Sequence, residues 1–413
     1  MSDEFKMVFE YTSYKDIDLK GKKILIRPDI NSNIDVENNT IRESPRIQAL
    51  ADALEEFKEC AVVIMAHQSR PGSKDFTSLK LHANELKKYT DLPVKFVDDI
   101  FGEKAVQTIK DLKVGEVLVL DNVRKWDTEN EIFEDFSEAE KTEMIQTLAP
   151  LFDYFIADAF GAAHRAQPSI IGWPSLVAGP TVIKEFEYMS KVLENPDKPL
   201  AMLIGGAKAI DKFKAMEYNF ENERLDYALC AGLTAVLILE AIGINTGAPN
   251  KDAISKDLSK AKDEIKSTYE KFKEKIILPK DLVIEKDGER EDIDINKVGE
   301  YDEVTGDIGK ETTNEFENIM QKCRTIIANG PPGIFEKEIF RKGTKEMAAA
   351  MAKATKENNA LSIIGGGEFG TAAEMFGYSD DISFISTGGG AMLEILSGID
   401  VPLVKALRLK IEI

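Results

Sequence analysis

Basic side chains follow four apolar runs in the first half of the chain, where they are suited to bind a small polyanion. The runs cover residues 23–26, 61–66, 116–120 and 154–157, and the basic side chains after them are Arg27, His67, Arg70, Arg124, His164 and Arg165. Arginine binds phosphate and carboxylate groups through two parallel hydrogen bonds. One such arginine is more often part of a surface ion pair, but four similar positions predict a shared anion site.

Glycines follow the corresponding apolar runs in the second half. These positions are Gly205–Gly206, Asn329–Gly330, Gly365–Gly367 and Gly388–Gly390. Glycines let a ligand approach the backbone, and N–H groups at a helix start favour phosphate. An isolated cluster of this kind is more often a tight turn without a ligand, but the series indicates a nucleotide site. An anion site and a nucleotide site in one chain predict phosphoryl transfer.

Charged residues accompany two of the glycine runs. Lys208 and Lys212 lie one helical turn apart after the first run, although the spacing is not that of a P-loop. Glu336 ends a proline-rich turn that starts at Asn329, and its carboxylate is suited to ribose hydroxyls.

Two local patterns leave alternatives open. Asp29 and Asn31 are suited to accept hydrogen bonds from substrate hydroxyls, but the same residues are typical of a strand-closing turn. The run 365–370 matches the GxGxxG pattern of dinucleotide-binding folds. Because no acidic residue follows the next predicted strand at 383–385, an NAD-dependent dehydrogenase is the weaker interpretation.

Composition bounds the class of protein. A chain of 413 residues exceeds what one core usually supports, so two domains are expected. The net charge of −20 argues against a nucleic-acid-binding or membrane-binding protein and makes the local clusters of basic residues more informative. Three scattered cysteines indicate a reducing cytoplasm, and no segment has the length and polarity of a membrane span or signal peptide.

Apolar runs alternate with stretches of helical period along the whole chain, which predicts an α/β fold with parallel sheets. The proline-bounded stretch 194–199, after a predicted helix at 184–193, marks a domain boundary. The predicted strands are 23–26, 61–66, 94–97, 117–120, 154–157, 200–204, 227–231, 275–278, 325–328, 362–364 and 383–385. The charged stretch 254–275 is predicted to be a solvent-exposed helix.

The motifs together resemble the phosphoglycerate kinase family, from about residue 22 to residue 391. The most specific segments are Asp-Ala-Phe-Gly-Ala-Ala-His-Arg at 158–165 and Asn-Gly-Pro-Pro-Gly-Ile-Phe-Glu at 329–336. The length and short loops are similar to the archaeal branch. The resemblance implies reversible phosphoryl transfer between ATP and the carboxylate of 3-phosphoglycerate, giving ADP and 1,3-bisphosphoglycerate in glycolysis and gluconeogenesis.

The same resemblance implies two Rossmann-like domains, each a mostly parallel sheet flanked by helices. Residues 1–183 would bind 3-phosphoglycerate and residues 196–391 would bind the Mg²⁺–nucleotide complex. Residues 184–195 would form a hinge helix between the domains, and residues 392–413 would return toward the first one. The oligomeric state, monomer or dimer, stays open.

For the first site, the resemblance places Asp29 and Asn31 at the glycerate part of the substrate and Arg46 nearest the transferred phosphoryl group. Arg46 opens a predicted helix and would alone be interpreted as a surface residue. The group implied to surround the phosphate and carboxyl groups is His67, Gln68, Ser69, Arg70, Arg124, His164 and Arg165.

For the second site, Lys212 would follow the γ-phosphoryl group and act in catalysis with Arg46. Glu336 would hold the ribose. The remaining implied nucleotide contacts are Gly206, Lys208, Asn329, Gly365, Gly366, Gly367, Glu368, Phe369, Gly388, Gly389 and Gly390.

The chain departs from the family pattern in four places. Pro28 and Ile30 replace Val and Phe, and Ser69 stands where glycine is usual, so a positive φ there would strain the backbone. Glu368-Phe369 replaces Asp-Thr or Asp-Ser, where the aspartate contacts the nucleotide's Mg²⁺. That replacement supports the runner-up interpretation, a regulator that binds both ligands without turnover, whereas the intact Arg46, Lys212 and Glu336 support the kinase.

Overall fold

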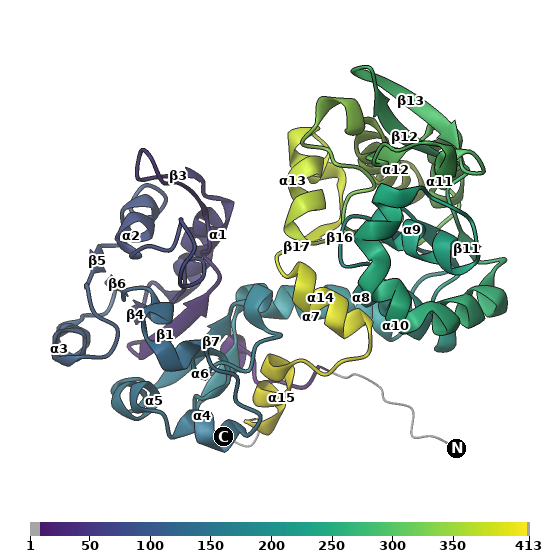
Figure 1. Ribbon diagram of the computed structural model, residues 1–413. Coiled ribbons are helices and arrows are strands. Elements are labelled where there is room, and N and C mark those ends of the chain that lie inside the picture. Colours follow the sequence, from purple (N-terminus) through teal and green to yellow (C-terminus); the bar gives the residue numbers. More distant parts are fainter. Residues whose placement is uncertain (1–8, 411–413) are drawn as a thin grey trace. The chain divides into compact units, whose positions relative to one another are not determined.

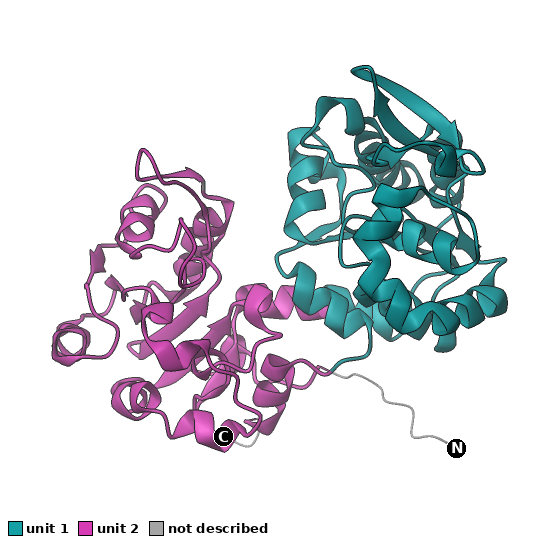
Figure 2. Cartoon of the chain, in the orientation of Figure 1, with its two compact units in different colours: residues 1–7, 188–399 teal, residues 8–187, 400–413 magenta. Residues whose placement is uncertain are grey.

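The computed structural model describes residues 9–410 and divides them into two compact units (Figures 1 and 2). The N-terminal unit comprises residues 9–187 together with 400–410, and the C-terminal unit comprises residues 188–399. Helix α7, Pro180–Leu193, contains the point where the first unit ends and the second begins.

The N-terminal unit contains a six-stranded, fully parallel sheet in the order β5-β6-β4-β1-β7-β8. The strands are β1 Lys23–Pro28, β4 Ala61–Ile64, β5 Val94–Phe96, β6 Val117–Val119, β7 Tyr154–Asp158 and β8 Leu176–Ala178. Their apolar side chains are almost all buried, as expected for strands covered on both faces. From β1 the chain first builds β4, β5 and β6 on one side and then β7 on the other. The carboxyl ends of β1 and β7 therefore lie at a topological switch point, where open α/β sheets bind ligands.

Helices and a hairpin complete this unit. The short hairpin pairs β2, Asn33–Asp35, with β3, Thr40–Glu43. The helices are α1 Pro45–Leu54, α2 Lys80–Leu86, α3 Glu103–Asp111, α4 Phe136–Glu140, α5 Glu143–Leu148, α6 Pro168–Ile171 and α15 Pro402–Leu409. Helix α15 comes late in the sequence but packs against this unit. The Leu403 N–H donates to Ala163 O at 3.1 Å, and Lys410, at the end of the helix, pairs with Glu140.

The C-terminal unit repeats the plan with a second parallel sheet in the order β11-β10-β9-β15-β16-β17. Its strands are β9 Leu200–Ile204, β10 Tyr227–Cys230, β11 Ile276–Ile277, β15 Thr325–Asn329, β16 Leu361–Gly365 and β17 Phe384–Ser386. The chain reverses direction across the sheet between β9 and β15, so the switch point lies there. Gly205 and Gly330 directly follow these two strands.

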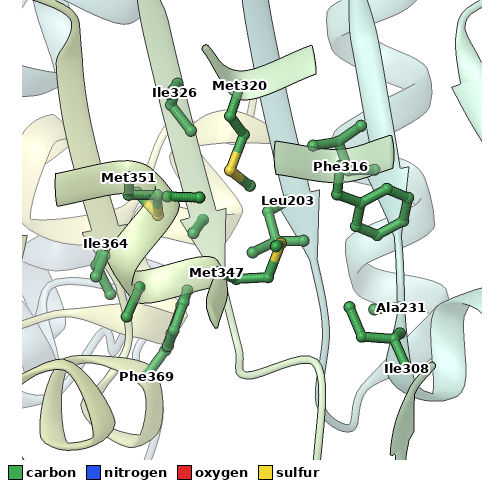
Figure 3. Packing of buried hydrophobic residues seen from close by; sticks show 14 of the residues in the cluster. Leu203, Ala231, Ile308, Phe316, Met320, Ile326, Met347, Met351, Ile364 and Phe369 are labelled. Atoms are coloured by element: carbon green, nitrogen blue, oxygen red, sulfur yellow. The ribbon is translucent and has the colours of Figure 1, made fainter. Parts of the chain in front are cut away.

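The helices of this unit are α8 Ala209–Glu221, α9 Gly232–Ala241, α10 Ala248–Phe272, α11 Lys310–Met320, α12 Lys342–Asn358, α13 Gly367–Met375 and α14 Gly389–Leu396. A small antiparallel sheet is formed by β12 Asp281–Lys286, β13 Glu289–Asp294 and β14 Asp307–Ile308. One apolar core joins side chains from α11, α12 and α13 to the large sheet; Figure 3 shows Phe316, Met347 and Phe369 among them.

All eleven predicted strands are present, most of them within one residue of the expected bounds. Strands β2, β3, β8, β12, β13 and β14 were not predicted. Strands β2, β3, β8 and β14 are only two to four residues long, β13 is largely charged, and β12 buries only the short run Leu282–Ile284. The charged helix begins at Ala248, earlier than expected, and ends at Phe272.

Candidate functional site: two strand-end pockets

Four of the predicted basic residues line one pocket of about 700 Å³ in the N-terminal unit. They are Arg70, Arg124, His164 and Arg165, which follow β4, β6 and β7. Burial, followed by the neighbouring Arg70 charge, lowers the pKa of Arg165. The Nη2 atom of Arg124 is buried without a hydrogen-bond partner in the structure. Concentrated positive charge with unsatisfied donors is the chemistry of an anion site.

Arg46 is joined to Asp29 and Asn31, as the predicted grouping requires. Its Nη1 donates to Asp29 Oδ2 at 3.0 Å and to the backbone oxygen of Asn31 at 3.2 Å. Arg46 lies in the first turn of α1, just after the helix-starting Pro45, so its position comes from a helix and not from a strand end. Asp29 also accepts from the Asn31 N–H, which confirms that a local turn closes β1.

Ser69 has a left-handed backbone conformation with φ of 58°. Three contacts hold it there: its N–H donates to Asn31 Oδ1 at 2.8 Å, its hydroxyl donates to Asp75 Oδ1 at 2.7 Å, and its carbonyl accepts from Arg124 Nη1. The strain expected from a non-glycine residue at this position is therefore present, and the Asp75 hydrogen bond is one that glycine would lack.

Gln68 is fully buried and bonded to other protein groups. Its Oε1 accepts from the Ser32 N–H and from His82 Nε2, both at 2.9 Å, and its Nε2 donates to Ser32 O at 3.0 Å. These contacts support the loop that carries Ser69 and Arg70. A direct contact between the Gln68 side chain and a substrate stays a prediction.

Arg27 does not lie on the pocket rim, where the strand-end pattern placed it. Its side chain is fully buried, and its guanidinium contacts Ser169 Oγ, Pro28 O and His67 Nδ1. His67 is also buried, with 6 % exposure. The expectation for Arg27 was wrong because a strand-end position in the sequence does not say whether the side chain points outward or back under the sheet edge.

The C-terminal unit has a smaller and more apolar pocket of about 290 Å³. Glycines and prolines at the switch point line one side, and aliphatic side chains such as Leu233, Val236 and Ile334 line another. Glu336 and Glu368 supply carboxylates, and Gly206 is the predicted glycine on the lining. A mainly apolar pocket with a few polar groups is typical of a site for a base and its sugar.

The switch-point glycines are required by close backbone packing. A Cβ on Gly205 would lie 2.3 Å from Pro331 O, and one on Gly330 would lie 2.5 Å from Gly205 O. Gly206 and Gly330 also have positive φ, at 65° and 80°. The backbone segments after β9 and β15 therefore pack so closely that a side chain at Gly205 or Gly330 would disrupt their contact.

Lys208 and Lys212 lie at the start of α8, with different environments. Lys208 is exposed and is the N-cap residue in a left-handed conformation, φ 59°. Lys212 is buried, and its Nζ donates to Gly205 O. Burial lowers the pKa of Lys212 to about 8, although Glu368 acts in the opposite direction.

Helices α13 and α14 begin at the other two predicted glycine runs. Gly366 is the N-cap of α13 with φ of 100°, and Gly367 is exposed, with no atom within 4 Å of an added Cβ. A Cβ on Gly389, in the first turn of α14, would lie 2.4 Å from Gly366 Cα. Asn329 Nδ2 donates to Gly389 O at 3.5 Å. The two helix starts and Asn329 are therefore neighbours, as are Gly365, Gly388 and Gly390 in the flanking backbone.

Glu368 and Phe369 follow Gly367 and point to different environments. Glu368 is exposed at the first turn of α13, whereas the Phe369 side chain is fully buried in the apolar core (Figure 3). A ligand contact by Phe369 is thus restricted to its backbone. Because the helix period places every third or fourth residue inward, the Phe369 side chain anchors the start of α13 to the apolar core.

Sequence reasoning missed lining residues in both pockets. Gln167 lines the cationic pocket with a buried, unpartnered Oε1, and Val304, Thr305, Gly306 and Asp307 line the apolar one. Asp307 pairs with Arg290 of the β13 strand at 2.8 Å. Residues 304–306 precede the two-residue strand β14 and Asp307 begins it, and the sequence contains no strong signal for this segment.

Comparison with known proteins shows the family to which a chain with these two pockets belongs. The family model described as phosphoglycerate kinase matches residues 14–399. The chain belongs to the phosphoglycerate kinase family. Among curated relatives, the phosphoglycerate kinase of Methanothermobacter thermautotrophicus is 37 % identical over 97 % of both chains. That of Methanococcus maripaludis is 38 % identical over 96 % of this chain and 98 % of its own.

Solved structures agree with this assignment. The crystal structure of phosphoglycerate kinase from Pyrococcus horikoshii OT3 is 34 % identical and has a TM-score of 0.89, covering 97 % of this chain and 99 % of its own. The phosphoglycerate kinase from Coxiella burnetii is 31 % identical with a TM-score of 0.78. The similarity to archaeal family members and the two-domain α/β fold expected from the motifs are confirmed.

Family membership establishes the activity: the chain is a kinase for ATP-dependent phosphoryl transfer with 3-phosphoglycerate, a glycolytic reaction. The dehydrogenase interpretation is thereby excluded. Among residues 9–410, no helix is long and apolar enough to cross a membrane.

Proposed function

We propose that the N-terminal unit binds 3-phosphoglycerate and the C-terminal unit binds the nucleotide. The observation that carries this assignment is the convergence of Arg70, Arg124, His164 and Arg165 on one pocket at the ends of parallel strands. In the C-terminal unit, the apolar pocket suits adenine, Glu336 suits the ribose, and the helix starts at Gly367 and Gly389 suit the phosphates.

Substrate contacts are proposed for the residues that the N-terminal unit brings together. Asp29 and Asn31 orient the glycerate part, and the basic group holds its phosphate and carboxylate. Arg46 lies beside Asp29 at 3.0 Å and is partly exposed, so its guanidinium has room to reach a second ligand. We assign Arg46 and Lys212 the catalytic roles.

No general base is needed for this transfer, because a carboxylate acceptor is already ionised at neutral pH. The protein's task is to bring anions together in line and to offset the charge that spreads over the moving phosphoryl oxygens. Arg46 and Lys212 provide positive charge, and backbone N–H groups provide donors. Since the two ligands bind to separate units, transfer requires those units to bring the ligands together and exclude water.

Magnesium would be held mainly through the nucleotide. Among the described residues, no three His, Cys, Asp or Glu side chains form a metal-binding group. Glu368 offers one exposed carboxylate on the nucleotide pocket, which fits an ion that takes its other ligands from phosphates and water. When bound, Mg²⁺ would neutralise phosphate charge, and Glu368 would orient it.

Gly367→Ala tests the nucleotide assignment without disturbing the fold. An added Cβ meets no atom in the protein, and alanine is the better helix former, so stability should be unchanged or higher. If phosphates approach this helix start, ADP affinity measured by calorimetry should fall at least about tenfold, whereas 3-phosphoglycerate affinity should not change. Unchanged ADP affinity would refute the placement of phosphates at α13.

A coupled assay with ATP, 3-phosphoglycerate and Mg²⁺ tests the kinase directly. Binding of both ligands without turnover would instead favour a regulator. The three cysteines are buried free thiols, which fits the proposed cytoplasmic location. We propose no nucleic-acid or membrane partner, and a monomer or a dimer as the assembly.

A further inference from the structure

A chain of buried polar groups lies in the N-terminal unit behind its basic residues. Glu129 accepts hydrogen bonds from the Ser169 hydroxyl at 2.5 Å and from the Ser169 N–H at 3.0 Å. Arg27 Nε donates to the same hydroxyl oxygen at 2.9 Å, and Arg27 Nη2 is 3.1 Å from His67 Nδ1. Each of these four residues is at most 6 % exposed. These hydrogen bonds therefore connect Glu129, on the 3-10 helix η4 (Asp127–Asn130), to His67, which is predicted to contact the substrate.

The direction of the last hydrogen bond in this chain is fixed by chemistry. A guanidinium has only donors, so His67 Nδ1 must accept from Arg27. A neutral imidazole that accepts at Nδ1 carries its proton on Nε2. A protonated ring would place two N–H groups against each other, which the geometry at 3.1 Å disfavours.

The surroundings of His67 act in the same direction. Burial, followed by the charges of Arg27, Arg165, Arg46 and His82, holds the pKa of His67 well below its ordinary value. Within residues 9–410, no protein group forms a hydrogen bond with His67 Nε2. Because the Arg27 hydrogen bond occupies Nδ1, Nε2 is the ring atom left for a ligand.

We propose that Arg27 is a positioning residue that fixes His67 as the neutral Nε2–H tautomer, so that His67 serves the substrate site as an uncharged hydrogen-bond donor. The inference rests on the proposed placement of 3-phosphoglycerate in this unit. Arg46, Arg70, Arg124 and Arg165 already supply positive charge there. A neutral donor adds a directed hydrogen bond to a ligand oxygen without another repelling cation, and it does so independently of pH near neutrality.

Removing Arg27 alone would leave the Glu129 carboxylate buried without its compensating charge, which destabilises proteins. The test variant is therefore Arg27→Met with Glu129→Gln, which removes both charges and keeps an amide to accept from Ser169. Glu129→Gln alone is the matched control, because it leaves the Arg27–His67 hydrogen bond in place and the Asp29 charge still acts on the buried guanidinium. Its far-UV circular dichroism must match that of the native protein before the histidine signals are compared.

Nitrogen-15 NMR of the ligand-free protein reads the tautomer directly. The chain has only three histidines, so the signals of His67, His82 and His164 are assignable from single substitutions of the other two. In the native protein and in Glu129→Gln, His67 should show protonated Nε2 and unprotonated Nδ1, with no titration near neutral pH. In the double variant, Nδ1 should shift toward the tautomer-averaged position, and the titration midpoint should rise by about one unit or more. A native Nδ1–H tautomer, or an unchanged His67 in a folded double variant, would overturn the proposal.

The pH dependence of the Kd for 3-phosphoglycerate is a second measurement, and it distinguishes a positioning role of Arg27 from a purely structural one. The ratio of the double variant's Kd to the native Kd should change at least about threefold between about pH 7.5 and pH 5.5, because His67 then gains a charge. A pH-independent ratio with the expected NMR change would refute the contact between His67 and the substrate. If the native protein did not bind 3-phosphoglycerate but His67 still showed the expected tautomer, the proposed substrate site would be refuted and the role of Arg27 would stand.

Discussion

The two pockets are built by opposite means. In the N-terminal unit, the long charged side chains of Arg70, Arg124 and Arg165 line the pocket. In the C-terminal unit, close-packed backbone supports one side of the pocket, and the glycines at 205 and 330 let neighbouring strand ends touch. A site made of side chains is disrupted when atoms are removed, whereas a site made of backbone is disrupted when atoms are added.

The largest effect is expected where an added atom has no room. In Gly330→Ala, the new Cβ would lie 2.5 Å from both Gly205 O and Lys212 Nζ, at a φ of 80°. Overpacking and a left-handed alanine together should cost about 2–5 kcal/mol and abolish ADP binding. Far-UV circular dichroism in urea measures the loss for the whole chain.

Gly243→Ala is the control for this substitution. Its φ of 94° is similarly strained, but an added Cβ meets nothing within 4 Å. Only about 1 kcal/mol should be lost there. Because Trp126 and Trp173 both lie in the N-terminal unit, tryptophan fluorescence should show that unit unfolding normally in either variant. Equal losses in the two variants would mean that close backbone packing does not define the C-terminal pocket.

In the side-chain site, removal of one charge should act on rate more than on folding. Arg46→Ala should lower kcat about 10²–10³-fold with a modest change in KM, because its charge is needed most when the phosphoryl group moves. Arg42→Ala is the control: that arginine is 60 % exposed and pairs only loosely with Asp35, at 3.5 Å. A KM increase at constant kcat would place Arg46 in substrate binding alone.

Protonation offers a third comparison, because only the N-terminal unit relies on buried histidines. Burial lowers the pKa of His82 to about 4, and the pKa of His67 is also depressed. As pH falls from 6.5 toward 4, these histidines therefore become protonated in the unfolded chain but stay neutral in the folded chain, so the free energy of unfolding decreases. His82 alone should cost about 3 kcal/mol across that window, and the stability should be complete above pH 6.5.

Urea unfolding followed by tryptophan fluorescence at several pH values measures this effect in the N-terminal unit. His82→Gln should remove about 3 kcal/mol of the pH dependence and leave the part that His67 contributes, since glutamine keeps a donor for Gln68 but does not titrate. If the variant and the native protein lose stability in parallel, His82 is not the group responsible.

The smallest effect concerns the left-handed Ser69. Ser69→Gly should relieve backbone strain but lose the 2.7 Å hydrogen bond to Asp75, so stability should change by no more than about 1 kcal/mol. Asp75→Ala should be worse than Ser69→Gly, because it leaves the strain without the hydrogen bond. Thermal unfolding of the two variants compares them; the reverse order would show that the hydrogen bond does not offset the strain.

Local patterns were sufficient for the strands of the two parallel sheets, except for the three-residue strand β8. Strand β9 was predicted with its observed bounds, and the four basic pocket residues were found because they follow apolar runs. The hairpin β12–β13 was not found, since its second strand is largely charged and its packing depends on Asp307 and Arg290 from separate segments.

The sequence by itself determined the order of strands and helices, the residue types at the strand ends, and, through its motifs, the family. The tertiary structure decided which strand ends meet, because a sheet order that reverses at β1 and β9 is a long-range property. It also decided that Arg27 is fully buried and bonded to Ser169, while the partly exposed Arg46 reaches Asp29 from a helix. The physical reason is that a side chain's burial and partners depend on contacts between segments far apart in the chain, which local spacing does not encode.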